Sequence, residues 1–212
     1  MIQVSRTTLN NLPGQSRAKQ GLAALIREQL AQKGLGWFVC SPNRGLPATL
    51  SGLGGIEIAT SEICDGSFQG VCLIRELANK IIEVFYAANR DRIAQLTDNL
   101  ALALGELLKN AAIHGNDRKP KKKVMVLFRQ AGQGFIINVL DEGRRPLFLL
   151  SRSWETHELA AWFRLNYSGQ NCGLLSIEQG FGPQNLSASK IYDASGRRLG
   201  TSISLLVKVL RP

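Results

Sequence analysis

The sequence predicts an α/β sandwich in which a mixed, mostly antiparallel sheet is covered on one face by two long helices. Two observations favour this fold: two long amphipathic segments follow each other in the first half of the chain, and two β-hairpin patterns occur in the second half. An amphipathic helix and a half-apolar strand each need a partner layer, and packing them together gives two layers. The 212 residues are enough for one compact domain with an appendage.

The first 54 residues are predicted to be an N-terminal extension, and residues 55–212 the main domain. Within the extension, residues 16–33 predict an amphipathic helix, because apolar residues recur at helical spacing: Leu22, Leu25, Ile26 and Leu30. Residues 34–55 then combine glycines and prolines with a few large apolar residues. That composition is typical of a connector or an irregular packed segment.

The main domain begins with a short predicted strand, IEIATSE, and continues with two long helices over residues 68–89 and 90–114. The first has an apolar series formed by Val71, Ile74, Leu77, Ala78, Ile81, Ile82 and Phe85. The second has an apolar stripe formed by Ile93, Leu96, Leu100, Leu104, Leu107 and Ala111. Each stripe must face a sheet or another helix.

Two hairpins complete the predicted sheet. The strands VMVLFRQ and GFIINVLD flank the turn AGQG, and the strands KIYDAS and TSISLLVKV flank GRRLG. Between the hairpins, residues 144–189 show no sustained periodicity apart from one short helix expected around ELAAWFRLNY. A segment of this length without regular structure is often a lid or a binding loop.

Three polar residues on the second long helix form the first candidate site. Glu106, Asn110 and His114 follow at i, i+4 and i+8, so they form one row that borders the apolar stripe. A buried polar group without a partner costs about 1–3 kcal/mol. We therefore expect something polar to lie over this row, unless the side chains bond to nearby backbone or reach solvent.

Three short segments of the sequence resemble the motifs of a known family. GELLKNAAIHGN, INVLDEGRRP and RLGTSIS resemble the N box, first glycine box and final strand of the gyrase, chaperone and histidine-kinase (GHKL) ATPase superfamily. The spacing Glu-x-x-x-Asn-x-x-x-His-Gly is closest to the bacterial anti-sigma-factor serine kinases. The resemblance implies a Bergerat-type fold that binds ATP between sheet, helix and lid.

The resemblance also implies residue roles. Asn110 would offer its side-chain oxygen to Mg²⁺, a hard cation that binds through few protein oxygens plus phosphates. Glu106 would be the catalytic base that orients or deprotonates the attacking group. Asp141 would accept the adenine amino group, and Gly143 would let the backbone approach the base. Further nucleotide contacts are expected from His114 and from Thr201, which closes the adenine pocket.

The sequence departs from the family in its glycine boxes. The pattern Asp-x-Gly-x-Gly is incomplete, because Arg145 replaces the second glycine. The second glycine box has two candidates, NCGLLSIE around Gly173 and GFGPQNL with Gly180 and Gly182, and the sequence does not decide between them. Backbone N–H groups at the start of a helix are the expected phosphate cradle.

Composition limits the partners. The net charge of +10 attracts nucleic acid, anionic lipid or acidic protein without choosing among them. Nucleic acid is disfavoured, because no recognisable binding motif or aromatic platform accompanies the KPKKK cluster. The resemblance implies a protein partner, namely a sigma factor or an antagonist-like regulator, and makes a homodimer possible. No membrane span or signal peptide is evident, so the expected compartment is the cytoplasm.

Two functions therefore remain open. The first is an ATP-binding regulatory protein that, with Mg²⁺, phosphorylates a serine or threonine on a protein partner, hydrolyses ATP or sequesters the partner. The second is a catalytically weakened module of the same fold that binds protein without turnover, as the altered glycine boxes would allow.

Overall fold

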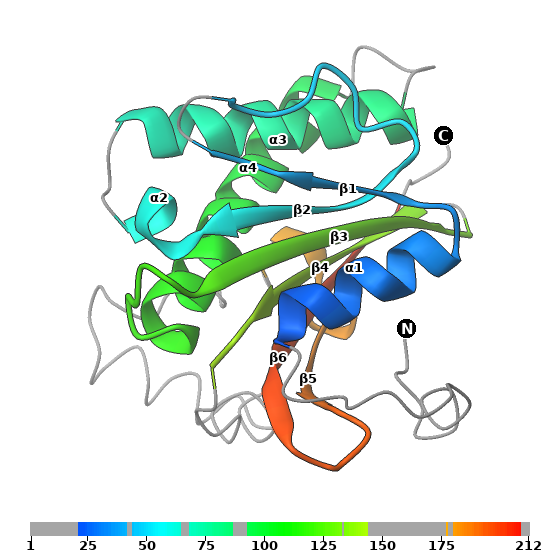
Figure 1. The fold of residues 1–212 in the computed structure, drawn as a ribbon. Coiled ribbons are helices and arrows are strands. Elements are labelled where there is room, and N and C mark those ends of the chain that lie inside the picture. Colours follow the sequence, from blue (N-terminus) through cyan, green and yellow to red (C-terminus); the bar gives the residue numbers. More distant parts are fainter. Residues whose placement is uncertain are drawn as a thin grey trace.

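The computed structural model describes residues 21–41, 44–64, 68–86, 93–132, 134–143, 177 and 180–208. Its framework is a six-stranded sheet with the strand order β1-β2-β3-β4-β6-β5 (Figure 1). β1 runs parallel to β2, and the other neighbouring pairs are antiparallel. The strands are β1 Gly36–Val39, β2 Leu53–Ala59, β3 Lys123–Ala131, β4 Gly134–Asp141, β5 Leu186–Tyr192 and β6 Arg198–Lys208.

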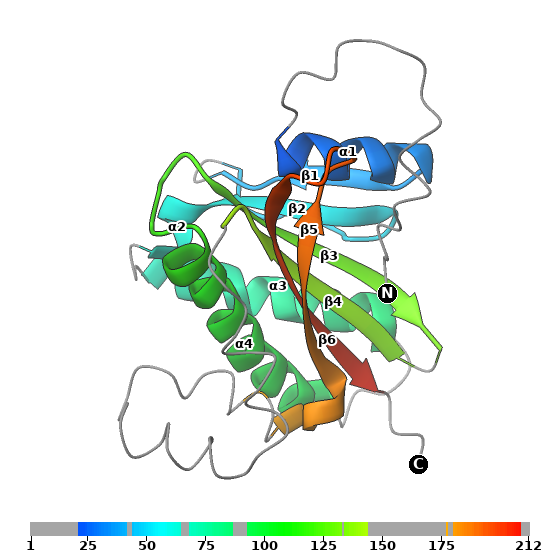
Figure 2. The ribbon, with the colours of Figure 1, turned by 90° about the horizontal axis from the view of Figure 1, so that it is seen from below.

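The helices lie on both faces of this sheet. They are α1 Leu22–Gln32, α2 Thr60–Cys64, α3 Phe68–Tyr86, α4 Ile93–Lys109, the π-helical turn η2 Asn110–Gly115 and the 3-10 turn η3 Pro183–Asn185. The long helices α3 and α4 cover one face, and α1 lies against the other (Figure 2). The predicted sandwich, with a mixed, mostly antiparallel sheet under two long helices, is confirmed.

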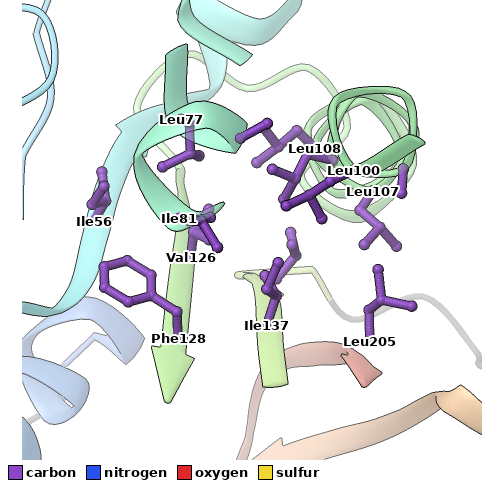
Figure 3. Close-up of a cluster of buried hydrophobic side chains, with 14 of the residues drawn as sticks. Ile56, Leu77, Ile81, Leu100, Leu107, Leu108, Val126, Phe128, Ile137 and Leu205 are labelled. Carbon is purple, nitrogen blue, oxygen red and sulfur yellow. The ribbon is translucent and has the colours of Figure 1, made fainter. Parts of the chain in front are cut away.

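The main core fills the space between the sheet and the two long helices (Figure 3). Alternate residues of the central strands point into it, as the two-residue repeat of a strand requires. Opposite them, α4 buries Leu100, Leu104 and Leu107 completely, three members of the predicted apolar stripe. The strand residues in this core include Val124, Val126, Phe128, Phe135, Ile137, Val139, Ile203 and Leu205.

A second, smaller core lies beneath α1. Its three buried residues, Leu22, Ile26 and Leu30, share one face of the helix because of their spacing. They pack on the opposite face of the sheet, against Met125, Leu127, Leu140 and Ile191. The predicted amphipathic helix is thus present from residue 22 to residue 32, and residues 16–20 lie outside the described part of the chain.

The segment expected to be a connector or an irregular packed segment contains the strand β1 and the start of β2. β1 pairs with β2, and β2 begins at Leu53, so the boundary expected near Gly54 falls within a strand. The glycines that suggested a loop have a packing role here. A Cβ on Gly54 would lie 2.7 Å from the side chain of Leu30, and one on Gly55 would lie 2.9 Å from the Trp37 ring.

The second long helix ends in an unusual turn. After Lys109 the helix widens into the π-helical turn η2, in which the N–H of Asn116 donates to the carbonyl of Ala111 at 2.8 Å. Two left-handed residues follow directly, Asp117 and Arg118, each with φ of 56°. Single π turns are rare in helices, and those that occur are often found at functional sites. The predicted polar row therefore reaches its end in this turn.

Both predicted hairpins are confirmed. β3 and β4 pair from Val124 opposite Asp141 to Ala131 opposite Gly134, and β5 pairs with β6. β5 begins at Leu186, four residues before the expected start. The short helix expected around residues 158–167 lies outside the described residues. Among the helices that are described, none has the length and apolarity to cross a membrane.

Candidate functional site

Asp141 and Thr201 lie side by side at one end of the sheet. They stand directly opposite each other in the ladder between β4 and β6, so their side chains share one face. Val139 and Ile203, two residues away on each strand, belong to the core beneath α3 and α4, which identifies that face. Asp141 is only 5 % exposed and Thr201 only 6 %. The structure thus brings together two predicted site residues that are far apart in the sequence.

Three glycines let backbone segments crowd around Asp141. A Cβ on Gly115, at the end of η2, would overlap the Asp141 carboxylate, and one on Gly200 would overlap the Asp141 carbonyl oxygen. A Cβ on Gly143 would overlap the carbonyl oxygen of Gly115. Gly143 was expected to admit the base, and its immediate neighbour here is the end of the N-box helix. Gly115 and Gly200 were not among the predicted site residues, although both belong to the recognised motifs.

Burial sets the charge behaviour of Asp141. Loss of hydration raises the pKa of this carboxyl group from 3.8 to about 6. The N–H of Gly143, which donates to Oδ1 at 2.7 Å, and the positive charges of Lys122 and Arg198 lower the pKa, but by less than burial raises it. A carboxylate can accept about four hydrogen bonds. Asp141 is therefore a desolvated acceptor that a neutral N–H donor on a ligand would stabilise.

Arg198 completes this end of the sheet. Its Nη2 donates to Oγ1 of Thr201 at 2.9 Å, so the Thr201 hydroxyl is held beside Asp141. Sequence reasoning placed Arg198 in the second hairpin without a role. Its basic side chain in a run of turn residues gave no signal that it would bond to Thr201.

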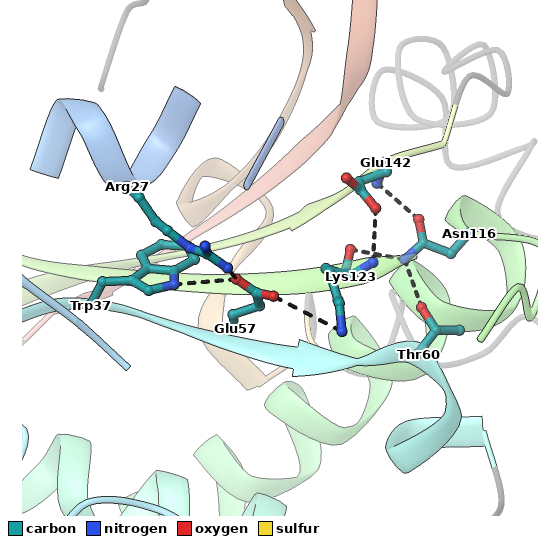
Figure 4. A network of polar contacts seen from close by, with 7 residues as sticks. All are labelled: Arg27, Trp37, Glu57, Thr60, Asn116, Lys123 and Glu142. Carbon is teal, nitrogen blue, oxygen red and sulfur yellow. Dashed lines mark hydrogen bonds and ion pairs between the residues drawn. The ribbon is translucent and has the colours of Figure 1, made fainter. Parts of the chain in front are cut away.

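Asn116 fixes the strand ends around Asp141 (Figure 4). The residue is fully buried, and its Nδ2 donates to Oγ1 of Thr60 at 2.9 Å and to the carbonyl of Lys123 at 3.0 Å. Its Oδ1 accepts the N–H of Glu142 at 2.8 Å. Glu142 in turn accepts the N–H of Lys123 through Oε2 at 2.9 Å. Asn116 stands at the end of the recognised word GELLKNAAIHGN, but its role was not predicted.

The predicted catalytic row is held far less firmly. The Glu106 side chain is 39 % exposed, and its carboxylate lies 3.8 Å from the ammonium of Lys109. Asn110, the first residue of η2, is half-buried, and His114 is exposed. The three residues lie on one side of the helix formed by α4 and η2. This helix ends at Gly115, which contacts Asp141. Glu106 and Asn110 therefore both keep part of their surface exposed to solvent.

The glycine boxes are only partly described. Gly143 lies beside Asp141, whereas Gly173, one candidate for the second box, lies outside the described residues. Gly182, the other candidate, adopts a left-handed φ of 85° ahead of η3. It precedes Leu186, which pairs with Leu205, so it lies toward the other end of β6 from Thr201. The choice between the two candidates stays open.

The chemistry of this cluster fits an adenine ring. A buried carboxylate can accept a hydrogen bond from an amino group, and a threonine hydroxyl adds a second polar partner. Asn110 and Glu106 add oxygen atoms of the kind that Mg²⁺ and a transferred proton need. Asp141 and Thr201 pair at one end of the sheet, and Gly115 at the end of η2 lies against Asp141. Glu106 on α4 and Asn110 on η2 precede Gly115 along the same helix.

Comparison with known proteins supports the same conclusion. Residues 71–160 match the family described as Histidine kinase-like ATPase domain. The match spans most of α3, all of α4 and η2, and the first hairpin, so it contains Glu106, Asn110 and Asp141. A search of curated proteins gives no significant match. This part of the chain is a histidine kinase-like ATPase domain of the GHKL superfamily, which implies ATP binding.

Proposed function

We propose that this histidine kinase-like ATPase domain binds ATP on the helix side of the sheet, at the paired ends of β4 and β6. The observation that carries the proposal is the position of Asp141, which is buried opposite Thr201 and touches the end of the helix that bears Asn110. There the Asp141 carboxylate accepts the adenine amino group. Thr201 closes the pocket from β6, and Gly143 and His114 border it.

The triphosphate extends from this pocket along η2 toward α4. Asn110 would hold Mg²⁺ through its amide oxygen, and the ion would neutralise charge on the phosphates. Glu106, one turn earlier, accepts the proton of a serine or threonine hydroxyl on a partner protein. The hydroxyl oxygen bonds to the γ-phosphorus, the bond to the β-phosphate oxygen breaks, and ADP leaves. Positioning and charge neutralisation supply most of the catalysis in such transfers.

The partner we propose is a regulatory protein, such as a sigma factor or the antagonist of a sigma-factor regulator in bacteria. The net charge of +10 favours an acidic surface on that partner. A protein acceptor also agrees with the exposure of Glu106, because a bulky hydroxyl donor can reach a carboxylate only if solvent reaches it too.

A second candidate function rests on the altered first glycine box. Arg145 stands where the family has glycine, and within the described part of the chain the Glu106 carboxylate pairs with the exposed Lys109. These features would suit a domain that binds nucleotide and protein without transferring phosphate. Both candidates share the nucleotide site and differ in turnover.

Calorimetric titration with a non-hydrolysable ATP analogue tests the shared site. We expect Mg²⁺-dependent binding by the wild type, loss of binding in Asp141→Ala, and loss of the Mg²⁺ dependence in Asn110→Ala. Asp98→Ala is a matched control, because Asp98 is 62 % exposed in a surface ion pair with Arg75. Absence of binding by the wild type would refute the proposal.

Phosphate transfer to protein, followed with labelled ATP, separates the two candidates. Glu106→Gln should keep nucleotide affinity and lower transfer by about 100-fold or more, in the range of general-base losses. Glu76→Gln, another exposed glutamate paired with a lysine on its own helix, should retain full activity. Equal transfer by wild type and Glu106→Gln would remove Glu106 from the mechanism, and absence of transfer in the wild type would favour the binding module.

A further inference from the structure

The first turn of α1 lies directly behind the strand ends that carry Asp141. Leu22 is 1 % exposed, and its Cδ2 lies 2.9 Å from the position that a Cβ on Gly200 would take. Gly200 in turn touches the carbonyl oxygen of Asp141. Gly21, just before the helix, faces Glu142. The backbone of the nucleotide pocket is thus supported from the opposite face of the sheet by α1.

An ion pair holds α1 in this position (Figure 4). Arg27, in the middle of the helix, bonds through Nη2 to Oε2 of Glu57 on β2. The Trp37 indole N–H donates to the same oxygen at 3.3 Å, and the Arg27 guanidinium lies 5.7 Å from the centre of the Trp37 ring. Glu57 is only 3 % exposed, so its carboxylate depends on these partners. We call Arg27, Trp37 and Glu57 the α1 clamp.

The α1 clamp also connects to the pocket through β3. The ammonium of Lys123 lies 4.0 Å from Oε1 of Glu57, and the N–H of the same lysine donates to Glu142. Glu142 directly follows Asp141, and its own N–H is held by Asn116. Two routes therefore lead from α1 to Asp141: one through Leu22 and Gly200, and one through Glu57, Lys123 and Glu142.

We propose that α1, fastened by its clamp, is a positioning element of the nucleotide site, so that releasing α1 weakens nucleotide binding although α1 itself touches no ligand. The inference rests on the proposed function for the identity of the ligand. It assigns a role to the N-terminal extension, which lies outside the matched region 71–160. Because coupling between two sites is reciprocal, bound nucleotide must also strengthen the docking of α1.

The test compares Arg27→Ala with Arg27→Lys and with the control Arg75→Ala. Lysine keeps the charge of the clamp, and Arg75 belongs to an exposed ion pair between α3 and α4. Titration with the ATP analogue should show about tenfold weaker binding for Arg27→Ala, partial rescue by Arg27→Lys, and no change for Arg75→Ala. Hydrogen exchange should show that nucleotide protects residues 22–32 in the wild type and protects them less in Arg27→Ala.

A second measurement does not need the ligand. The carboxyl carbon of Asp141, followed by NMR as pH changes, reports how well its surroundings exclude water. Its pKa of about 6 should fall toward 3.8 in Arg27→Ala, because β6 at Gly200 is then no longer backed by Leu22, and movement of the strand ends lets water reach the carboxylate on the other face of the sheet. The pKa should stay unchanged in Arg75→Ala. Lys122, Arg198 and Glu142 are the neighbouring charges, and all are retained in these variants.

The two measurements separate this inference from the proposed function. Wild-type affinity and an unchanged Asp141 pKa in Arg27→Ala would overturn the positioning role while leaving ATP binding intact. A wild type that binds no ATP, with an Asp141 pKa that falls in Arg27→Ala, would refute the nucleotide proposal and still support the coupling. Should Arg27→Ala fail to fold, Trp37→Phe removes the N–H donor of the clamp, leaves a smaller ring beneath Arg27, and should shift affinity and pKa in the same direction.

Discussion

The two halves of the candidate site are built differently. Around Asp141 the side chains are buried and bonded: Asn116 is fully buried, and Asp141 and Thr201 are each less than a tenth exposed. Along the helix, Glu106 is 39 % exposed and lies in an ion pair with Lys109, and His114 is exposed. One half is fixed by the fold, and the other is open to solvent.

This contrast agrees with different roles for the two halves, ligand selection around Asp141 and catalysis along the helix. A rigid, desolvated acceptor selects a ligand at low entropic cost, because little has to be ordered on binding. Catalytic side chains often reach their working geometry only when substrate is bound, so exposure of Glu106 in the free protein agrees with a catalytic role. We therefore expect changes near Asp141 to affect both stability and binding, whereas changes at Glu106 should affect turnover alone.

The largest effect on stability is expected from Asn116→Ala. The change removes three hydrogen bonds and leaves the Thr60 hydroxyl, the Lys123 carbonyl and the Glu142 N–H without this partner. At about 1–3 kcal/mol for each buried unpaired group, and with some relaxation, the free energy of unfolding should fall by about 4 kcal/mol. Urea denaturation measures it.

Asn138→Ala is the control for that prediction. Asn138 is half-buried on the sheet face that carries α1, and its Nδ2 donates to Oγ of Ser204. Its loss should cost about 1 kcal/mol. Equal losses in the two variants would show that Asn116 has no special structural role.

The next effect is a pH dependence caused by Asp141. Its pKa is about 6 in the folded protein and 3.8 in the unfolded chain, so the folded state holds the proton more tightly. The stability from this group is complete below pH 3.8 and is lost as pH rises to about 6, with a total change of about 3 kcal/mol. Asp141→Asn should remove this dependence and be more stable than the wild type at pH 7.5 without nucleotide.

Denaturation curves between pH 4 and pH 8 measure the difference between wild type and variant. The control Asp98→Asn changes an exposed carboxylate and should follow the wild-type curve. Parallel curves for wild type and Asp141→Asn would mean that Asp141 is hydrated in the folded protein.

A smaller loss of stability, coupled to loss of binding, is expected from Gly143→Ala. The new Cβ would overlap the Gly115 carbonyl oxygen, so the end of η2 must move away from β4. Overpacking of this kind costs about 2 kcal/mol, and the displaced helix end should abolish nucleotide binding. Thermal denaturation and calorimetry measure the two effects.

Gly105→Ala is the matched glycine control. A Cβ there would lie 3.9 Å from Ile74, an ordinary contact, in the middle of α4. Alanine should stabilise the helix by about 0.5–1 kcal/mol and leave nucleotide binding unchanged. Retained binding in Gly143→Ala would show that contact between η2 and β4 is not needed for the site.

Much of the fold was predictable because it depends on repeating patterns. The apolar stripes of α3 and α4 and the alternation in β3 and β4 predicted their layers. β1 was missed because a four-residue edge strand next to glycines has no periodicity to detect. Gly54 and Gly55 looked like loop residues, and only the structure shows the Leu30 and Trp37 side chains that occupy the space beside them.

Candidate site residues could be predicted where they belong to a recognised motif. Residues whose role depends on partners distant in the sequence could not be predicted. Asp141 and Thr201 came from motif resemblance, and their cross-strand pairing agrees with a shared site. Asn116, Arg198 and Glu57 gave no such signal, because each owes its role to partners distant in the sequence. For Glu57 the partners include a helix 30 residues away, which no local pattern reveals.

The proposed site depends most directly on one interaction, a hydrogen bond from the amino group of adenine to the carboxylate of Asp141. Calorimetry should compare the Mg²⁺ complexes of ATP and of inosine triphosphate, which has a carbonyl oxygen in place of that amino group. We expect inosine triphosphate to bind about 100-fold more weakly or not at all, because two acceptors would face each other in a desolvated site. In Asp141→Asn, whose amide can donate to the carbonyl, most of this difference should disappear. Equal affinity of the wild type for the two nucleotides would contradict the assignment of Asp141 and with it the proposed site.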